Sequence, residues 1–328
     1  MSNIETAPVE VECASAPAAA VEIHTPRDVP LGGPRAMPVR RTLPQRSRSL
    51  IGAWCFVDHY GPDAVARTGG MVVPPHPHTG LQTVSWLFTG EIEHRDSTGA
   101  HAMVRPGELN LMTAGRGIAH SEVSTPQTST LHGVQLWLAL PEASRHIDPR
   151  FEHYAPEPVA GPGWAARVFL GELAGSFSPV RTHSPIVGAE ILLEPGTVLD
   201  LDADPRFEYG LLADTGNLLF QRAAVAPGEL AYVPPGSTGL RIAAPADSSV
   251  RAVLLGGEPL GETIVMWWNF IGRSHEEIVQ YRRDWQQHLG AETHPGASAA
   301  SRFSAVPDDP LPPLPAPVLP NARLRPRR

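Results

Sequence analysis

The stretch from Gly70 to Glu122, GMVVPPHPHTGLQTVSWLFTGEIEHRDSTGAHAMVRPGELNLMTAGRGIAHSE, decides the fold of this chain and carries its candidate site. Short apolar or alternating runs are separated by turns that contain glycine, and no helical period appears between Gly70 and Leu140. Short strands joined by tight turns are typical of antiparallel barrels and sandwiches. The stretch therefore predicts an all-β fold.

Two pairs of metal-ligand residue types lie on the predicted strands, one pair flanking Pro77 and the other flanking Ser121. Residues at i and i+2 of a strand share a face, so the two members of each pair can converge on one point. If the two strands are neighbours, three imidazoles and one carboxylate meet inside the sheet. We therefore predict a mononuclear metal site with these ligands: His76, His78, His120 and Glu122.

Simpler interpretations of these residues have to be weighed against the metal site. The HPH sequence at 76–78 could form a polar turn between prolines, and it is the second pair at the same spacing that favours a metal. Ser121 suggests a hydrolase, but adjacent strand residues face opposite ways, so His120 cannot act as its base. We expect the following histidines to be ordinary exposed or hydrogen-bonded residues: His59, His94, His101, His132, His146, His153, His183, His275 and His288.

The charge and the type of basic residue exclude several classes of function. With 34 Asp and Glu against 26 Lys and Arg, the formal net charge is −8, opposite in sign to a surface that binds nucleic acid. Direct binding of nucleic acid is therefore not expected. In addition, all 26 basic residues are Arg, which excludes Schiff-base chemistry, pyridoxal phosphate attachment and the P-loop lysine.

Cysteine usage and the lack of a targeting segment predict a cytoplasmic location. Only Cys13 and Cys55 occur, so a disulfide framework and a cysteine zinc site are excluded by count. The N-terminus lacks a basic region followed by a long apolar core, and no apolar run is long enough to cross a bilayer. We expect no association with membranes.

The second half of the chain repeats the pattern of short strands and turns. The sequence PGEL at 106–109 recurs at 227–230, each time followed by strand residues and a turn with glycine. This repeat favours two copies of one β-barrel unit. No His occurs between His183 and His275, so the second barrel is predicted to have no imidazole for a metal.

One helix and two tails complete the predicted organisation. Ser274 with Glu277 forms a capping box, an apolar helical face follows, and Gly290 ends the helix. The predicted segments are a disordered N-terminal tail at 1–21, a first barrel with the metal site at 22–150, a second barrel without metal at 151–272, the helix at 273–290, and a disordered Ala/Pro-rich tail at 291–328.

Longer motifs carry a resemblance to a known family. Gly70, followed after five residues by HPH, fits the first cupin motif, and GIAH at 117–120 fits the second. HPHTGLQTVSW, TGEIEHRDSTG and MTAGRGIAHSE resemble the pirin branch of the cupins, as do TPRDVPLGG, LPQRSRSLIGAWCFVDHYGP and VMWWNFIGRSHEEI. The resemblance runs from about Glu22 to about Leu289.

The resemblance implies a bicupin fold, two antiparallel cupin barrels packed together, with one divalent metal in the first. By position the family ligands are the same four residues, and ferrous iron is the first expectation, with manganese, nickel, cobalt, zinc or copper as alternatives. Gln82 stands where general cupins have a ligand Glu, which implies a place outside the ligand set. Thr79 stands where many relatives have Arg, which alters the charge at the pocket mouth.

The resemblance also implies a function, and three hypotheses stay open. The first is a dioxygenase that cleaves quercetin-type flavonols with O2, with Glu122 as the catalytic base and a small aromatic substrate in the first barrel. The second is a redox-sensitive, iron-binding regulator that acts through a protein partner without catalysis. The third is a stable bicupin whose ion only ties strands together. Pirin-like proteins are expected to be monomers.

Overall fold

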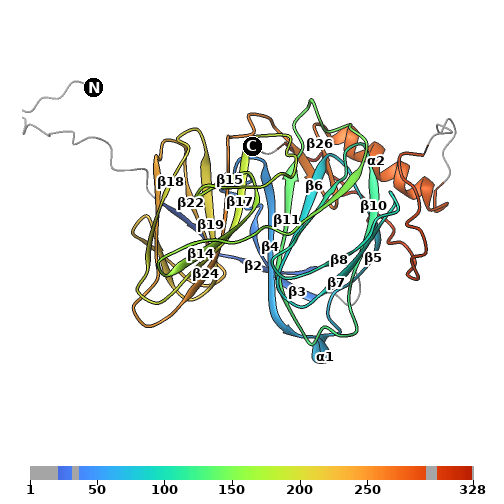
Figure 1. The fold of residues 1–328 in the computed structure, drawn as a ribbon. Coiled ribbons are helices and arrows are strands. Elements are labelled where there is room, and N and C mark those ends of the chain that lie inside the picture. The colour runs from blue at the N-terminus through green and yellow to red at the C-terminus, as the bar shows by residue number, and fades with distance from the viewer. Residues whose placement is uncertain (1–20, 32–36, 293–300, 327–328) are drawn as a thin grey trace, which may run out of the picture.

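The structure is a computed structural model that describes residues 21–31, 37–292 and 301–326. Two antiparallel β-barrels lie side by side, and one longer helix packs against the first barrel (Figure 1). The predicted all-β fold of two packed cupin barrels with a C-terminal helix is confirmed. Parts of the predicted tails and of one connection lie outside the described residues, at 1–20, 32–36, 293–300 and 327–328.

The first barrel is built from two sheets, ordered β12-β9-β6-β11-β4-β3-β2 and β5-β10-β7-β8. The strands of the larger sheet are β2 (Arg27–Leu31), β3 (Met37–Leu43), β4 (Trp54–Ala64), β6 (Leu81–Thr89), β9 (Leu109–Thr113), β11 (Thr130–Ala139) and β12 (Arg150–Tyr154). Those of the smaller sheet are β5 (Val72–His78), β7 (Ile92–Asp96), β8 (His101–Val104) and β10 (Ile118–Ser124). The predicted ligands therefore lie on adjacent strands, β5 and β10.

The second barrel also has two sheets, ordered β1-β22-β19-β24-β17-β14-β13 and β18-β23-β20-β21. Its strands are β1 (Glu22–His24), β13 (Val159–Gly161), β14 (Trp164–Leu170), β17 (Ile186–Leu193), β18 (Val198–Asp202), β19 (Glu208–Thr215), β20 (Leu218–Phe220), β21 (Ala223–Val225), β22 (Leu230–Val233), β23 (Gly239–Ala243) and β24 (Val250–Gly257). Short elements complete the chain: α1 (Val65–Thr68) and the hairpins β15 (Glu172–Leu173) with β16 (Ser176–Phe177) and β25 (Val265–Trp267) with β26 (Phe270–Gly272).

A shared apolar layer joins the two barrels. Val84 and Trp86 of β6 pack in one buried cluster with Phe169, Leu212 and Leu255 of the second barrel. Because strand side chains alternate, the residues of β6 that face this layer point away from the interior of the first barrel. The interface between barrels thus resembles a domain core, which fixes the two barrels in one arrangement.

The N-terminal strand belongs to the second barrel rather than the first. β1 pairs antiparallel with β22, with Ile23 opposite Ala231 and His24 opposite Leu230. The sequence placed everything from residue 22 in the first barrel. The reason for the difference is that β22 would otherwise be an edge strand with unpaired backbone groups, and β1 covers that edge.

The hairpin of β25 and β26 returns from the second barrel to the first. The Ile271 N–H donates to the Thr79 carbonyl at 3.0 Å, directly beside the HPH strand. Gly80 has φ +69°, and a Cβ at this position would lie only 2.3 Å from the Ile271 carbonyl oxygen. Glycine is therefore needed at position 80 for the hairpin to lie this close to β5.

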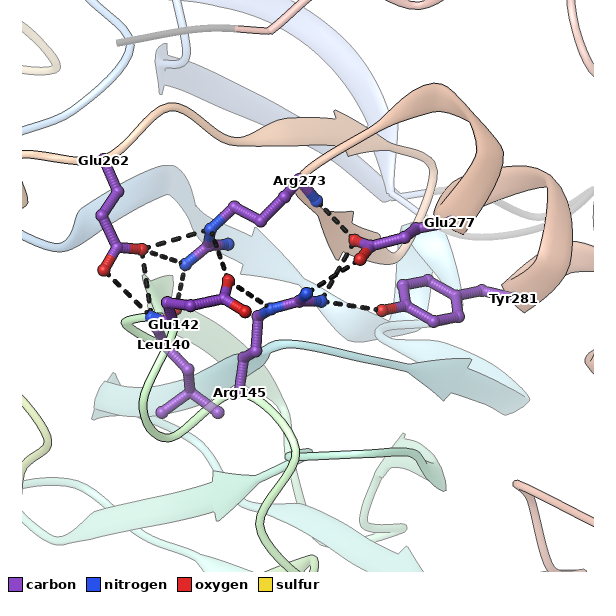
Figure 2. A network of polar contacts seen from close by, with 7 residues as sticks. All are labelled: Leu140, Glu142, Arg145, Glu262, Arg273, Glu277 and Tyr281. Carbon is purple, nitrogen blue, oxygen red and sulfur yellow. Dashed lines mark hydrogen bonds and ion pairs between the residues drawn. The ribbon is translucent and has the colours of Figure 1, made fainter.

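A polar network holds both ends of this hairpin against the first barrel (Figure 2). Arg145 Nε donates to Glu142 at 2.7 Å, and its other nitrogens donate to Glu277 at 2.8 Å and to the Tyr281 hydroxyl at 3.2 Å. Arg273 donates to the Leu140 carbonyl at 2.8 Å. The loop after β11 is thus tied both to the hairpin and to the helix that follows it.

Removal of the central guanidinium should destabilise this junction. Arg145 is only 6% exposed, so Arg145→Ala leaves the partly buried Glu277 carboxylate and Tyr281 hydroxyl without their partner. We expect a loss of about 2 to 3 kcal/mol in the free energy of unfolding, measured by urea denaturation. Arg116→Ala is the control, because Arg116 is 58% exposed and pairs with the exposed Asp148. An equal loss in both variants would contradict this role of Arg145.

The longer helix, α2 (His275–His288), begins as predicted. The Ser274 side chain accepts the Glu277 N–H at 3.2 Å. Ile278, Tyr281 and Trp285 are buried in an apolar cluster beside the first barrel. No helix in the described part of the chain is long and apolar enough to span a bilayer. The capping box and apolar face identified in the sequence thus define this element correctly.

The segment 301–326 differs from the expected disordered tail. Phe303 is buried, the Leu314 N–H donates to the Pro75 carbonyl at 2.8 Å, and Trp285 Nε1 donates to the Leu314 carbonyl at 2.8 Å. β5 is an edge strand, and its outward carbonyl groups need partners. A proline-rich, extended segment can supply such a partner without forming regular structure, which composition alone did not indicate.

Candidate metal centre

Three of the four predicted ligands converge inside the first barrel. β5 and β10 are antiparallel neighbours, and their register places His120 opposite His76 and Ile118 opposite His78. The three imidazoles are 6%, 1% and 1% exposed in the order His76, His78 and His120. The structure thus brings the HPH pair and His120 together, as the i and i+2 spacing predicted.

The distances between the imidazoles fit one metal ion. The Nε2 atom of His78 lies 3.1 Å from that of His76 and 3.0 Å from that of His120. Two nitrogens at right angles on an ion with bonds of about 2.1 Å are about 3.0 Å apart, whereas a tetrahedral ion separates them by about 3.4 Å. Both separations that involve His78 therefore fit adjacent positions of an octahedral ion better than those of a tetrahedral one.

Neighbouring groups hold the outer nitrogens of these rings. His76 Nδ1 lies 2.9 Å from the Pro74 carbonyl oxygen, and His120 Nδ1 lies 3.5 Å from His94 Nδ1. Burial holds the pKa of His78 well below its usual value, an effect that the backbone of Asn269 in the β25–β26 hairpin only partly opposes, and His78 Nδ1 has no hydrogen-bond partner among the described residues. With Nδ1 of His76 and of His120 engaged outside, the Nε2 lone pairs of these two rings can face an ion.

Glu122 lies beside this cluster rather than within it. Its carboxylate shares a second group with His94 and His120, in which the donor atoms are within 4.8 Å of one another. In the described residues, no group at this spacing contains Glu122 together with His76 and His78. Burial raises the pKa of Glu122, and Ser85 Oγ donates to Oε1 at 2.9 Å. Glu122 as a fourth ligand remains a prediction.

A bulge explains the position of Glu122. His120 pairs with His76, but Glu122 pairs with Val73, so β5 has one extra residue between the two pairs. The extra residue falls at Pro74 and Pro75, which have no N–H to continue the ladder. Ideal strand spacing could not reveal this shift along the strand.

Aromatic and apolar side chains lie beside the three imidazoles. Trp137 packs edge-on against His78 with ring centroids 5.1 Å apart, and Met112 belongs to the same inner cluster. The Trp86 indole instead donates to Glu190 of the second barrel at 3.3 Å, so it is not a lining residue. Gln82 donates to Thr113 at 2.9 Å.

Ser121 confirms the argument against a hydrolase. Its hydroxyl donates to the Asp309 carboxylate of the C-terminal segment. Because it faces away from His120 and the barrel interior, His120 cannot act as its base. The serine acts as an anchor for the segment that covers the outer face of β10.

Two of the residues assigned as ordinary histidines form a separate buried cluster between the barrels. His59 Nε2 and His132 Nε2 lie 2.7 and 2.6 Å from the same oxygen of Asp214. These are hydrogen-bond lengths. Two ligand atoms on one ion are expected to be farther apart, at about 3.0 Å. Arg251 donates to the other Asp214 oxygen at 3.3 Å. The cluster is a hydrogen-bonded link between β4, β11 and β19.

Acid should destabilise the chain after treatment with a chelator, which keeps the candidate site free of metal. Burial lowers the pKa of His76 from about 6.5 to about 4, so this ring stays neutral in the folded chain. The stabilising effect is complete above pH 6.5 and is lost as the pH falls toward 4, by about 3 kcal/mol for this one group. Urea unfolding between pH 7 and pH 4 measures it. His76→Ala should show a shallower dependence on pH, and an equal dependence would contradict the assignment.

Two antiparallel barrels with three converging histidines in the first define a two-domain cupin protein with a candidate metal centre. The chain belongs to the pirin family. The family model described as Pirin matches residues 36–138, and the model described as Pirin C-terminal cupin domain matches residues 188–289. The family identified from the sequence motifs is thus confirmed.

Individual relatives agree with this assignment. A Pseudomonas aeruginosa protein named "Putative quercetin 2,3-dioxygenase" is 43% identical over 284 residues, covering 86% of this chain and 89% of that protein. A pirin-like protein of Caulobacter vibrioides is 36% identical, covering 76% and 88%. The crystal structure of a quercetin 2,3-dioxygenase from Acinetobacter baumannii has a TM-score of 0.84 and 35% identity, covering 92% of this chain and 96% of that chain.

Proposed function

We propose that this chain is a metal-dependent dioxygenase that cleaves quercetin-type flavonols with O2. The observation that carries the proposal is the set of three buried imidazoles with Nε2 atoms 3.0 and 3.1 Å apart. The relatives named for quercetin 2,3-dioxygenase activity support the substrate class. The reaction opens the central flavonol ring and releases carbon monoxide.

The metal that we propose is one divalent ion, with ferrous iron first and manganese, nickel, cobalt, zinc or copper as alternatives. His76, His78 and His120 would hold it, since neutral imidazoles suit all of these ions. When bound, the ion supplies an acidic centre for the flavonol oxygen and an open position for dioxygen. Glu122 would complete the set by a side-chain movement toward the histidines.

The chain's own residues would carry the proton transfer and orient the substrate. Glu122 accepts the flavonol hydroxyl proton, a task that its raised pKa favours, because a carboxylate that is buried away from water is a stronger base. Ser85 holds the carboxylate through its 2.9 Å hydrogen bond. Trp137 offers an aromatic wall next to His78, against which a flat flavonol can stack.

Quercetin turnover by the iron-loaded chain tests the proposal. The amounts of flavonol consumed, oxygen taken up and carbon monoxide released should increase together and be equal. Flavonol consumption is measured as the decrease in its absorbance. Glu122→Gln keeps the shape of the side chain and should lower the rate by about a hundredfold or more. No oxygen uptake by the loaded chain, beside an active quercetin dioxygenase as control, would reject the enzyme.

A second candidate is a redox-sensitive iron protein that acts through a protein partner. The burial of the site favours it, because none of His76, His78, His120 and Glu122 is more than 6% exposed and a flavonol needs an opening. A partner from native lysate whose retention depends on ferrous or ferric iron, without oxygen consumption, would support this function. The monomeric state and cytoplasmic location remain predictions.

A further inference from the structure

Behind His120 lies a second histidine that the metal site does not include. β7 is the other neighbour of β10, with His94 opposite Glu122 and Asp96 opposite His120. His94 Nδ1 lies 3.5 Å from His120 Nδ1, and His94 Nε2 lies 3.2 Å from Asp96 Oδ2. The result is a row of groups, Asp96, His94 and His120, that ends at the metal-facing Nε2 atom.

The orientation of Asp96 is fixed by its own turn. Oδ1 accepts the Thr98 N–H at 2.8 Å, the Thr98 hydroxyl at 2.6 Å and the Ala100 N–H at 3.3 Å. Oδ2 is therefore left for His94. Asp96 and His94 are 0% and 2% exposed, so water does not compete for these contacts. His94 also stacks on Phe151, with ring centroids 4.7 Å apart.

These contacts determine which nitrogen of each ring carries a proton. A carboxylate only accepts hydrogen bonds, so His94 Nε2 carries a proton, and in the neutral ring His94 Nδ1 then has a lone pair. That lone pair faces His120 Nδ1, which therefore carries a proton in turn. A neutral imidazole has one proton, so the His120 Nε2 lone pair is free to face His78 and the ion.

We propose that Asp96 and His94 are positioning residues that fix the tautomer of His120 in which Nε2 can bind the metal. The inference rests on the proposed metal site but goes beyond it, because it assigns metal affinity to residues that do not touch the ion. His94 is not itself a ligand, since both of its nitrogens are engaged by Asp96 and His120. Outer partners of this kind typically contribute about ten- to a hundredfold in metal affinity.

Asp96→Asn tests the inference with almost no change in shape. The Thr98 and Ala100 N–H groups keep the amide oxygen in the Oδ1 position, so the amide N–H₂ must face His94 Nε2. His94 then carries its proton on Nδ1 and drives the His120 proton to Nε2, where it blocks the ion. Cobalt(II) titration of the chelator-treated chain should show affinity about ten- to a hundredfold weaker, at an unchanged metal-free melting temperature.

Further variants make the outcome decisive. His94→Phe keeps the stack on Phe151 without the nitrogens and should weaken cobalt(II) binding to the same degree, which covers the case in which Asp96→Asn does not fold. His101→Ala on β8 is the control, because the His101 side chain is 49% exposed and pairs with Glu93 rather than with His94, Asp96 or His120. The ¹⁵N shifts of His120 in the metal-free chain should report a proton on Nδ1, and on Nε2 in Asp96→Asn.

The possible failures can be told apart. If the unmodified chain binds no cobalt(II), the proposed metal site is wrong. If the unmodified chain binds cobalt(II), while Asp96→Asn and His94→Phe bind it within threefold of the same affinity, only the role of Asp96 and His94 is wrong. An unchanged His120 tautomer in Asp96→Asn would overturn the inference independently of any metal.

Discussion

His78→Ala should weaken metal binding by more than about a hundredfold, beyond the range for loss of an outer partner. His78 is the middle ligand, within 3.1 Å of the nitrogen atoms of both His76 and His120, so its removal leaves two imidazoles that cannot enclose an ion. Flavonol cleavage should fall to the level of the metal-free chain. Cobalt(II) titration and oxygen uptake measure both effects.

The metal-free form of the same variant makes this prediction sharper. In the metal-free chain the Nε2 atoms of His76 and His120 both face His78 Nε2, which can offer a proton to only one of them, so at least one contact brings two lone pairs together. His78→Ala relieves part of that cost, so its metal-free stability should fall less than that of a typical buried large-to-small change of about 3 kcal/mol. His101→Ala is again the control. Cobalt(II) affinity of His78→Ala within threefold of the unmodified chain would reject the three-histidine site.

Asp214→Ala should lower the free energy of unfolding by about 3 to 5 kcal/mol, the largest effect on stability that we expect. The carboxylate is fully buried and accepts hydrogen bonds from His59 and His132 of the first barrel and from Arg251 of its own. Burial alone would raise its pKa, but the hydrogen bonds from His132 and His59 hold it well below its usual range. Its removal leaves two buried imidazoles without their acceptor and takes one of two carboxylate partners from Arg251, which also pairs with Glu190 at 3.1 Å.

Two variants separate this effect from loss of a charge at the surface. Asp214→Asn keeps an oxygen for both histidines and should lose less, about 1 to 2 kcal/mol. Asp200→Ala removes an aspartate that is 65% exposed and paired with Arg241, and should change stability by less than about 0.5 kcal/mol. Urea unfolding that gives the same loss for Asp214→Ala and Asp200→Ala would contradict a buried link between the barrels.

Local spacing was sufficient to predict the centre of the site. The HPH pair and His120 were identified because side chains at i and i+2 share a strand face, and because turns between them allow the two strands to pair. The capping box at Ser274 likewise defined α2 correctly. Each pair and the capping box depend on residues near one another in the chain, and the convergence of the pairs needed only that neighbouring hairpins fold back on each other.

Features that depend on distant partners could not be predicted. The bulge at Pro74 and Pro75 shifts the position on β5 that Glu122 pairs with. The bulge depends on how the two strands pair rather than on either sequence alone. His59 meets Asp214 across 155 residues. His94 had a local signal, since its i and i+2 relation to Asp96 places both side chains on one face of β7, but the meaning of that pair depends on β10 being the neighbour.

Anomalous diffraction from crystals of the cobalt(II)-loaded chain tests the central claim most directly. We expect one strong peak in the first barrel, about 2.1 Å from the Nε2 atoms of His76, His78 and His120. The same data show whether Glu122 has moved to join them. A cobalt peak elsewhere, or no peak in crystals of a chain that remains folded, would contradict the claim that these three histidines hold a metal ion.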